Sequence, residues 1–403
     1  MKLIIKLIFF FLINALPASA SPNFLDAQLK AAALRNGYKV PNAVNSTFDK
    51  ELAKLGEAFF NSKELSFNGN TSCSSCHLEK FSSSDGIPNA IGVGGSGEGF
   101  HRLQGRGALV PRNTLPLWGR ASEDFAMFFW DGKVELSNGK IISQFGSSPP
   151  SQDALTVAIH LPFVEIREMV VDDSFVDENL KTETLGSAFK IQNELLNRVK
   201  SDLKLAQSLA DLNSVTLSEL KFIHVAEAIR HFFAKNFRLQ STRFSEFIEN
   251  NGKLSHEELN GGIIFYGKGM CSSCHSGPHF SDFKTHTIAY PQAGPGKNGF
   301  GSDYGRFNFT LQFEDLNKFR TPPLHNVEKT GPYGHSGSVF SLREAIVGHY
   351  DPFSLYDFDL MSSLQRRELF QKLISIPEQQ ATPSHLSEKE LSNLIAFLKS
   401  LSF

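Results

Sequence analysis

Apolar residues recur at helical spacing in the first part of this chain. Phe48, Leu52, Leu55 and Phe59 follow one another at intervals of three or four residues, so they would share one face of a helix. The preceding segment, 23–35, also has a helical pattern. A polar stretch follows Phe59, and the pattern therefore predicts two helices and then a loop.

The arrangement returns in the second half of the chain. Ser255 and Glu258 form an S-x-x-E capping box before the apolar segment 259–266. Ser387 and Glu390 form another capping box near the end. The helix after it has an apolar face made of Leu391, Leu394, Ile395 and Leu398. The other helical stretches that the pattern predicts are 184–208 and 216–235.

Loops separate these helices. Glycines are frequent in 86–107, a turn is expected at 129–132, and a second loop covers 291–305. No strand is predicted before Gly92–Gly95, so a phosphate-binding loop is not expected. The sequence Asn250-Asn251-Gly252 precedes the second series of helices, and we take residue 250 as a domain boundary. The predicted fold is mainly α with long loops.

The first twenty residues have the pattern of a secretory signal peptide. Lys2 and Lys6 precede an apolar run, 7–16, and Ala18-Ser19-Ala20 provides a small-x-small cleavage site. A membrane anchor is the alternative, but the run is short for a bilayer span and Pro17 interrupts its end. We therefore expect residues 1–20 to be removed and the mature protein to be periplasmic. No later segment predicts a membrane span.

The length of the chain predicts its number of domains, and its charge excludes some classes of partner. A chain of 403 residues predicts two or three domains. The formal net charge of -2 and the pI near 6.7 argue against binding to nucleic acid or to an anionic membrane surface. Partners must therefore be inferred from the chemistry of particular residues.

All four cysteines lie in two identical pentapeptides, Cys-Ser-Ser-Cys-His, at 73–77 and 271–275. C-x-x-C-H is the attachment pattern of c-type haem, because two thiols bind the porphyrin vinyl groups and the adjacent histidine ligates the iron. The pattern assigns two covalently bound haem c groups. Their attachment and proximal residues are Cys73, Cys76 and His77, and Cys271, Cys274 and His275.

A four-cysteine zinc site and two redox disulfides are the alternatives. Neither needs a histidine directly after each second cysteine, so both explain the pattern less completely. Each pentapeptide follows a predicted helix, which indicates a duplicated unit. We therefore expect two cytochrome c-type haem domains, 21–250 and 251–403.

Five further motifs accompany the haem pentapeptides. They are Pro111-Arg112-Asn113-Thr114, Phe129-Trp130-Asp131-Gly132, Glu168-Met169, Phe319-Arg320-Thr321-Pro322 and Thr330-Gly331-Pro332-Tyr333-Gly334-His335-Ser336-Gly337. In this order, they resemble the bacterial diheme cytochrome c peroxidases and the related MauG enzymes over nearly all of the mature chain. The resemblance implies that hydrogen peroxide reacts at the N-terminal haem, whereas the C-terminal haem receives electrons.

The resemblance also implies roles for two residues, one in proton transfer to peroxide and one in electron transfer. Glu168 corresponds to the catalytic glutamate, which would move a proton between the two peroxide oxygens. Trp130 corresponds to a tryptophan between the haems, where it would relay electrons. The family's distal glutamine is missing here. Its position falls near Ala158, and the nearest glutamine upstream is Gln152.

Further iron ligands are implied by the same resemblance. At the C-terminal haem, the position of methionine in the peroxidases and of tyrosine in MauG holds His349, with Tyr350 as the alternative. Two histidine ligands would lower the haem potential relative to histidine and methionine. At the N-terminal haem, His101 lies in the loop that carries a distal histidine in some peroxidases, where Val93 competes for the position. Without this ligand the distal site would be open.

The family also binds calcium between its domains. The matching ligands here are the side chain of Asn113 and the backbone carbonyls of Thr330 and Pro332. Oxygen ligands of this kind suit calcium.

Three functions follow as hypotheses. The first is a periplasmic diheme peroxidase that reduces hydrogen peroxide with electrons from a small redox protein, such as a cytochrome c or a cupredoxin. The second is a MauG-like oxidase that oxidises residues of a partner protein. The third is a non-enzymatic diheme electron-transfer cytochrome, against which Glu168 in its motif argues. A homodimer is one assembly that is compatible with the sequence.

Overall fold

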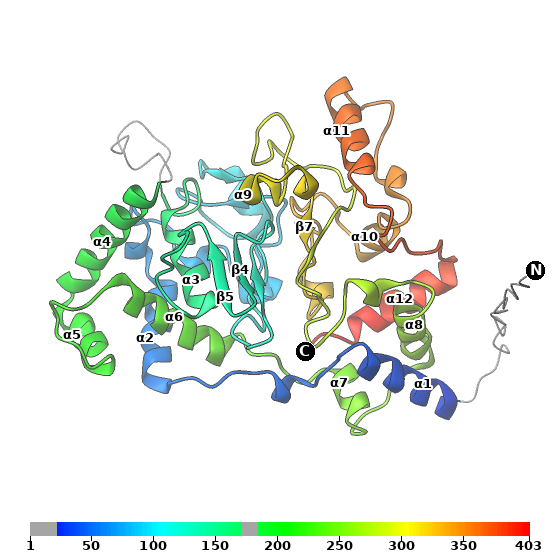
Figure 1. The fold of residues 1–403 in the computed structure, drawn as a ribbon, viewed down its shortest axis with the longest axis horizontal. Helices are drawn as coiled ribbons and strands as arrows, with labels where there is room; N and C mark the ends of the chain where they lie inside the picture. Colours follow the sequence, from blue (N-terminus) through cyan, green and yellow to red (C-terminus); the bar gives the residue numbers. More distant parts are fainter. Residues whose placement is uncertain (1–21, 171–183) are drawn as a thin grey trace, which may run out of the picture.

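The computed structural model describes residues 22–170 and 184–403, and its fold is mainly helical, as the sequence predicts (Figure 1). The expected signal peptide, 1–20, lies outside the described residues. The helices are α1 (Pro22–Arg35), α2 (Lys50–Asn61), α3 (Ala154–His160), α4 (Leu185–Ser201), α5 (Leu203–Leu212), α6 (Phe222–Asn236), α7 (Arg243–Ile248), α8 (His256–Tyr266), α9 (Phe307–Thr310), α10 (Leu342–Val347), α11 (Ser363–Ile374) and α12 (Glu388–Lys399). The strands are β1 (Ala90–Ile91), β2 (Leu109–Val110), β3 (Met127–Phe128), β4 (Val134–Ser137), β5 (Lys140–Ser143), β6 (Thr285–His286) and β7 (Phe319–Arg320).

Both predicted capping boxes are confirmed. The hydroxyl of Ser255 accepts a hydrogen bond from the backbone N–H of Glu258, and Glu258 accepts one from the backbone N–H of Ser255. Ser387 and Glu390 form the same pair of bonds at the start of α12. Each box satisfies backbone N–H groups that have no partner within the first turn of a helix.

Local caps also explain where the observed helices differ from the predicted ones. The side chain of Asp49 caps α2, so Phe48 of the predicted apolar face lies before the helix. The stretch 184–208 is divided because Asp202 caps a new helix, α5. The stretch 216–235 becomes helical only at Phe222.

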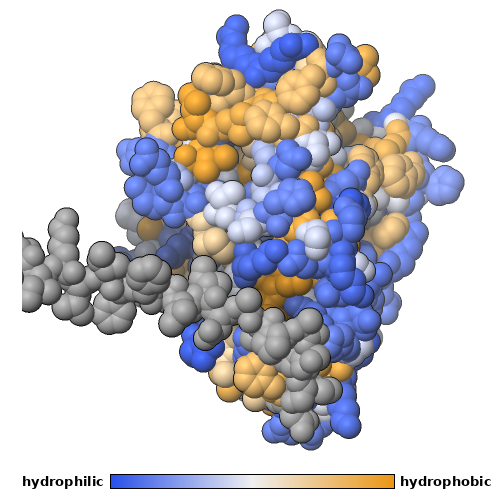
Figure 2. Space-filling model, turned by 90° about the vertical axis from the view of Figure 1, so that its right-hand side faces the viewer, coloured by the Kyte–Doolittle hydropathy of each residue, from blue (hydrophilic) through white to orange (hydrophobic). Residues whose placement is uncertain are grey.

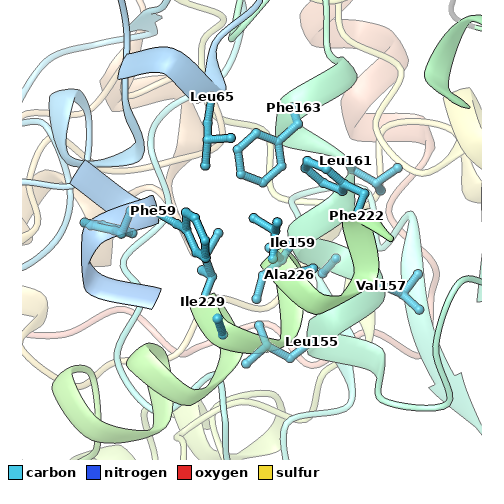
Figure 3. Close-up of a cluster of buried hydrophobic side chains, with 14 of the residues drawn as sticks. Phe59, Leu65, Leu155, Val157, Ile159, Leu161, Phe163, Phe222, Ala226 and Ile229 are labelled. Atoms are coloured by element: carbon cyan, nitrogen blue, oxygen red, sulfur yellow. The ribbon is translucent and has the colours of Figure 1, made fainter. Parts of the chain in front are cut away.

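Two large clusters of buried apolar residues form the core. The first lies among α2, α3 and α6, where Phe59, Leu155 and Ile229 converge (Figure 3). The second joins α1, α8 and α12 and includes Leu29 and Phe397. In Figure 1 the first cluster lies in the left half of the molecule and the second in the right half.

The boundary expected at residue 250 does not coincide with this division. Both α1 and α7 precede residue 250, yet Leu29 of α1 and Phe244 of α7 belong to the second cluster. The apolar face of α1 packs against α8, which covers it. Position along the chain could not reveal this packing, because α1 could cover either unit.

The two clusters are built in the same way. In each, the helix before a haem pentapeptide crosses a later helix, with α2 against α6 and α8 against α12. A Cβ atom at Gly56 would lie 2.0 Å from the carbonyl oxygen of Ala228, and one at Gly261 would lie 1.9 Å from that of Asn393. Any larger residue would therefore push the helices apart. This shared crossing supports the predicted duplication.

The strands form three small antiparallel sheets. The largest contains β3, β4 and β5, and a two-residue turn, Asn138-Gly139, joins β4 to β5. Both turn residues have positive φ, 50° and 73°, as in the tight turns that match the twist of a hairpin. The hairpin was not predicted, although Asn-Gly between two short apolar segments is its usual signal.

Apolar side chains are exposed on α11. Figure 2 shows hydrophobic side chains gathered at the top of the face that carries this helix. Phe370 and Ile374 of α11 are 61% and 66% exposed, whereas Leu369 is buried. Within the described ranges, no helix is both long and apolar enough to cross a bilayer.

Candidate functional site

Both pentapeptides fold in the same way. Residues Cys73–Ser75 and Cys271–Ser273 form single 3₁₀ turns, and in each the backbone N–H of the histidine donates to the carbonyl of the first cysteine. These bonds measure 3.0 Å for His77 and 2.8 Å for His275. The turns bring two cysteines and one histidine together within five residues, as attachment to a single group requires.

Each histidine ring is fixed by a backbone carbonyl. Nδ1 of His77 donates to the oxygen of Ser83 at 2.7 Å, and Nδ1 of His275 donates to that of Phe280 at 2.9 Å. The hydrogen bond from Nδ1 sets the tautomer of each ring and leaves Nε2 free to bind a metal. Burial lowers the pKa of each imidazole to about 4, so both are neutral at pH 7. A metal ligand must be neutral in this way.

A cavity of 490 Å³ adjoins the first pentapeptide. Cys73, Cys76 and His77 line it on the side of the attachment motif. Its apolar lining includes Phe60, Leu155, Ile159, Phe163, Ile229 and Phe233. The cavity is of a size that holds organic cofactors in proteins.

The cavity suits haem in charge as well as in size. Arg120 lines it and is buried, and burial lowers the pKa of its guanidinium to about 10. Nε donates to the carbonyl of Pro116 at 2.8 Å, but no carboxylate in the described part of the chain pairs with this arginine. Haem carries two carboxylate groups, and a guanidinium binds such a group through paired hydrogen bonds. Arg120 is therefore a suitable partner.

Glu168 lies in a turn that other loops hold in place. The backbone N–H of Val93 donates to the carbonyl of Arg167 at 3.1 Å, and Phe67 bonds in the same way to Met169 at 2.9 Å. A Cβ atom at Gly92 would lie 1.9 Å from the oxygen of Arg167, so only glycine allows this approach. The glycine-rich loop thus fixes the turn that carries Glu168 into the cavity.

The cavity environment poises Glu168 for proton transfer. Burial and the nearby carboxylate of Glu165 raise the pKa of Glu168 to about 7, against the opposing charges of Lys133 and Lys297. Lys133 and Glu165 line the same cavity and form an ion pair. A carboxyl group with a pKa near 7 can both accept and return a proton at neutral pH.

Trp130 lies at the junction of the two halves. It lines the cavity, and its side chain packs with Leu115 and Phe319 in a small buried cluster. Its indole N–H donates to the carbonyl of Asn113 at 2.9 Å, and its own carbonyl accepts from the N–H of Arg320 at 2.8 Å. The residue is therefore held rigidly between the N-terminal and C-terminal segments.

His349 lies opposite His275 at the second pentapeptide. Their ring centroids are 6.5 Å apart. Two imidazoles that bind one metal from opposite sides, with bonds of about 2 Å, would have centres roughly 6 Å apart. Nδ1 of His349 donates to the carbonyl of Ala345 at 2.7 Å, which leaves Nε2 available. The ring of Tyr350 instead packs against His385, with centroids 5.3 Å apart.

Two residues singled out in the sequence lie away from the cavity. His101 is exposed in a 3₁₀ turn, Gly99–Gln104, and does not line the cavity. Gln152 is also exposed and does not line it. Ala158 does line the cavity, but its methyl group cannot donate a hydrogen bond. Among residues 22–170 and 184–403, the structure thus brings neither His101 nor a glutamine to the cavity of His77 and Glu168.

Two of the three residues expected to bind calcium meet. The side-chain amide of Asn113 lies 2.6 Å from the carbonyl oxygen of Pro332. The amide oxygen Oδ1 of Asn113 is buried and has no hydrogen-bond partner in the described residues. Turning the amide would place Oδ1 beside the carbonyl of Pro332, as two ligands of one cation would lie. Thr330, the third expected ligand, precedes Pro332 by two residues.

Several cavity residues were missed in the sequence. Lys133 directly follows the motif that contains Trp130, and Glu165 precedes Glu168 by three residues, so their position beside known motifs was a usable signal. Lys297 comes from the loop 291–305, more than a hundred residues later. No local pattern connects this loop with the first cavity.

Comparisons with known proteins agree with these features. Residues 50–253 match the model of the di-haem cytochrome c peroxidase family. The methylamine utilization protein MauG of Methylorubrum extorquens is 24% identical over 96% of this chain and 88% of that protein. The cytochrome c551 peroxidase of Nitrosomonas europaea is 24% identical over 87% of this chain and 80% of that protein.

Solved structures share the fold. A MauG-like protein associated with microbial copper homeostasis has 22% identity and a TM-score of 0.61, covering 91% of this chain and 93% of that chain. The diheme peroxidase BthA from Burkholderia thailandensis has 19% identity and a TM-score of 0.62, covering 91% of this chain and 89% of that chain. By its family match, its two haem pentapeptides and its fold, this chain belongs to the di-haem cytochrome c peroxidase family.

Proposed function

We propose that this protein is a periplasmic peroxidase that reduces hydrogen peroxide to water at the haem of Cys73, Cys76 and His77. The observation that carries the proposal is the presence of Glu168 in the cavity of this pentapeptide, with a pKa near 7. A plain electron carrier needs no proton-transfer group in such a cavity. The overall reaction consumes one peroxide, two electrons and two protons and yields two water molecules.

Haem, when bound, would supply an iron that binds peroxide and passes electrons to it. His77 holds the iron through Nε2, because its Nδ1 is engaged by Ser83. Glu168 accepts the proton of the inner peroxide oxygen and returns it to the outer oxygen, which leaves as water. Transfer by a positioned carboxylate of this kind speeds a reaction about 10²- to 10⁴-fold.

Electrons enter through the second pentapeptide. His275 and His349 would both hold the iron of this haem, which agrees with the 6.5 Å between their rings. Held by two histidines, the group would supply electron transfer and would not react with peroxide. Trp130 relays the electrons, since it is buried at the junction of the two halves. The donor is a small redox protein such as a cytochrome c or a cupredoxin.

A calcium ion between the halves completes this arrangement. Asn113, Thr330 and Pro332 are its proposed protein ligands, and water would supply the others. The unpartnered Oδ1 of Asn113 supports the site, because a buried amide oxygen without a partner is unfavourable. The cation would tie the segment around Asn113 to the segment that begins at Thr330.

A MauG-like oxidase that acts on residues of a partner protein is the second candidate. His349 favours it, because two imidazole ligands would lower the potential of the second haem and make reduction by a common cytochrome c less favourable. In this case peroxide would still react in the cavity that contains Glu168, but the electrons would come from the partner protein.

The rate of reaction between the purified protein and hydrogen peroxide tests the proposal. Absorbance changes of the haem would be followed by stopped flow, with the oxidised and the half-reduced protein. Glu168→Gln should slow the reaction about 10²- to 10⁴-fold while both haems stay attached. A wild-type protein that does not react in either state would leave only the electron carrier. Oxidation of a reduced cytochrome c in the same mixture would separate the peroxidase from the oxidase.

A further inference from the structure

The cavity of Glu168 contains a second, buried pair of charges. Lys133 is 6% exposed, and its ammonium forms an ion pair with Glu165. Both residues line the cavity together with Glu168. The ammonium also lies 4.6 Å from the centre of the Phe129 ring. Its position is therefore fixed by a carboxylate and by an aromatic face.

A buried lysine is unfavourable unless its charge is compensated. Burial lowers the pKa of Lys133, but Glu165 and Asp131 more than offset this effect and raise it, so the lysine is charged at pH 7. Asp131 is itself bound to Arg112 at 2.6 Å. Across residues 22–170 and 184–403, Glu165 is the one carboxylate at ion-pair distance from Lys133.

The ammonium of Lys133 has hydrogen-bonding capacity to spare. It carries three N–H donors, and the described residues supply one hydrogen-bond acceptor, an oxygen of Glu165. Unused donors beside a cavity bind whatever acceptor enters it. Lys297 lines the same cavity but is exposed, so water screens its charge.

We propose that Lys133 is a catalytic residue that donates a hydrogen bond to the oxygen ligand in this cavity, and that Glu165 is the positioning residue that holds it. The inference rests on the proposed peroxide reaction. It also fills a gap, because the residues near Ala158 supply no glutamine. Lys133 would donate the hydrogen bond that a glutamine amide would otherwise donate, and its ammonium group would add a full positive charge.

The step balances without transfer of the lysine's proton. Glu168 takes the proton of the inner oxygen and returns it to the outer oxygen, and the oxygen–oxygen bond breaks with both bonding electrons on the outer oxygen, which leaves as water. The two electrons that the haems would supply and two protons from solvent convert the inner oxygen to the second water. Negative charge grows on the outer oxygen before the proton arrives. The hydrogen bond from Lys133 stabilises that charge, as fixed cations do in other water-excluded sites.

Fluoride binding tests the inference without peroxide. Fluoride is an anion that binds ferric haem, and its affinity would be measured by absorbance titration of the wild type and variants, both fully oxidised and half-reduced. Lys133→Met should weaken fluoride binding about 10- to 100-fold, as expected for loss of a hydrogen bond from a charged donor. Lys133→Arg should keep the affinity within a few-fold. Lys140→Met, at an exposed lysine of β5 that does not line the cavity, is the control and should change it less than threefold.

A double-mutant cycle tests the role of Glu165. If Glu165 acts through Lys133, Glu165→Gln changes the fluoride affinity in the wild type but leaves that of Lys133→Met within twofold. Haem content and circular dichroism would show that each variant is folded, and Lys133→Gln replaces Lys133→Met if the latter is not.

Three results would overturn the inference. The first is an unchanged affinity in Lys133→Met, and the second is an equal effect of Lys133→Met and Lys140→Met. The third is a wild type that binds no fluoride in either state, since the cavity would then have no open position. Failure of the peroxide reaction with a normal fluoride response would refute the proposed function, and Lys133 would then be an anion-binding group only.

Discussion

At the scale of single residues, one cavity holds two carboxyl groups with different protonation. The ion pair with Lys133 offsets the effect of burial and lowers the pKa of Glu165, whereas burial and the charge of Glu165 raise that of Glu168. Glu165 is therefore ionised at pH 7 and Glu168 is only partly so. Such a division between an electrostatic group and a proton carrier is common where two carboxyl groups share a site.

The rate of the peroxide reaction should depend on pH through Glu168. Its carboxylate form accepts the proton of peroxide, so the protonated form below pH 7 is inactive. The second-order rate constant should rise with pH and reach half of its plateau near pH 7. Stopped-flow measurements between pH 5 and 9 would show this rise, and Glu168→Gln should remove it. A profile that is flat in the wild type would contradict the assignment.

The potential of the second haem should respond to His349. Replacement by methionine, His349→Met, should raise it by on the order of 0.1 V, a fraction of the roughly 0.8 V range that axial ligands control. Tyr350→Phe is the control and should leave the potential unchanged, because the Tyr350 ring packs against His385. Redox titration followed by absorbance measures both. Equal potentials in His349→Met and the wild type would argue against His349 as a ligand.

At the scale of elements, two helix crossings support the two pentapeptides. α2 crosses α6 and α8 crosses α12, and at each crossing a glycine lies against a carbonyl of the other helix. The helix that precedes each cysteine pair is therefore positioned by a partner far along the chain. Its last turns set where the pentapeptide begins, and so the crossing helps to position the pentapeptide.

Alanine at either crossing should destabilise the protein. Gly56→Ala and Gly261→Ala each place a methyl group about 2 Å from a backbone oxygen, and overpacking of this kind costs roughly 1–3 kcal/mol. The matched control is Gly186→Ala in α4, where the nearest atom lies 3.9 Å away and alanine favours the helix. Thermal unfolding by circular dichroism compares the three. A loss in Gly186→Ala as large as in the others would refute this explanation.

At the scale of the whole molecule, a buried ion network joins the two halves. Arg112 bonds to Asp131 at 2.6 Å and binds both oxygens of Asp303, at 2.7 and 2.9 Å. Asp131 belongs to the N-terminal segment and Asp303 to the loop that also carries Lys297. The network therefore holds this loop of the second half against the cavity of the first.

Loss of Arg112 should weaken this junction. Arg112→Met leaves two buried carboxylates without their partner, which typically costs 3–5 kcal/mol. Chemical denaturation at pH 7 measures the loss, and Arg343→Met, which removes an ion pair between two exposed side chains, Arg343 and Glu388, is the control. A loss below 1 kcal/mol in Arg112→Met would mean that water replaces the guanidinium.

The same network should make the protein sensitive to acid. Burial would raise the pKa of Asp303, but Arg112 outweighs burial and lowers it to about 2. A folded pKa below the unfolded value of about 3.9 stabilises the fold above pH 4, and this contribution is lost as the pH falls toward 2. Unfolding curves of the wild type should shift over this range. The shift should be much smaller in Arg112→Met.

The sequence by itself determined the features that depend on neighbouring residues. The cysteine pairs with their histidines predict the haem attachment residues, and side chains such as Ser255 and Ser387 define where helices begin, because caps act within one turn. The family motifs also identified Glu168, Trp130 and His349 as residues to follow.

Only the tertiary structure decided which distant residues meet. It brought Lys297 to the cavity of Glu168, joined α1 to the second core and left His101 on the surface, because long-range packing depends on which apolar faces cover one another. The raised pKa of Glu168 follows from burial beside Glu165 and is likewise a property of the folded chain. The predicted attachment of the cofactors thus follows from neighbouring residues in the sequence, whereas the chemistry proposed beside them depends on the fold.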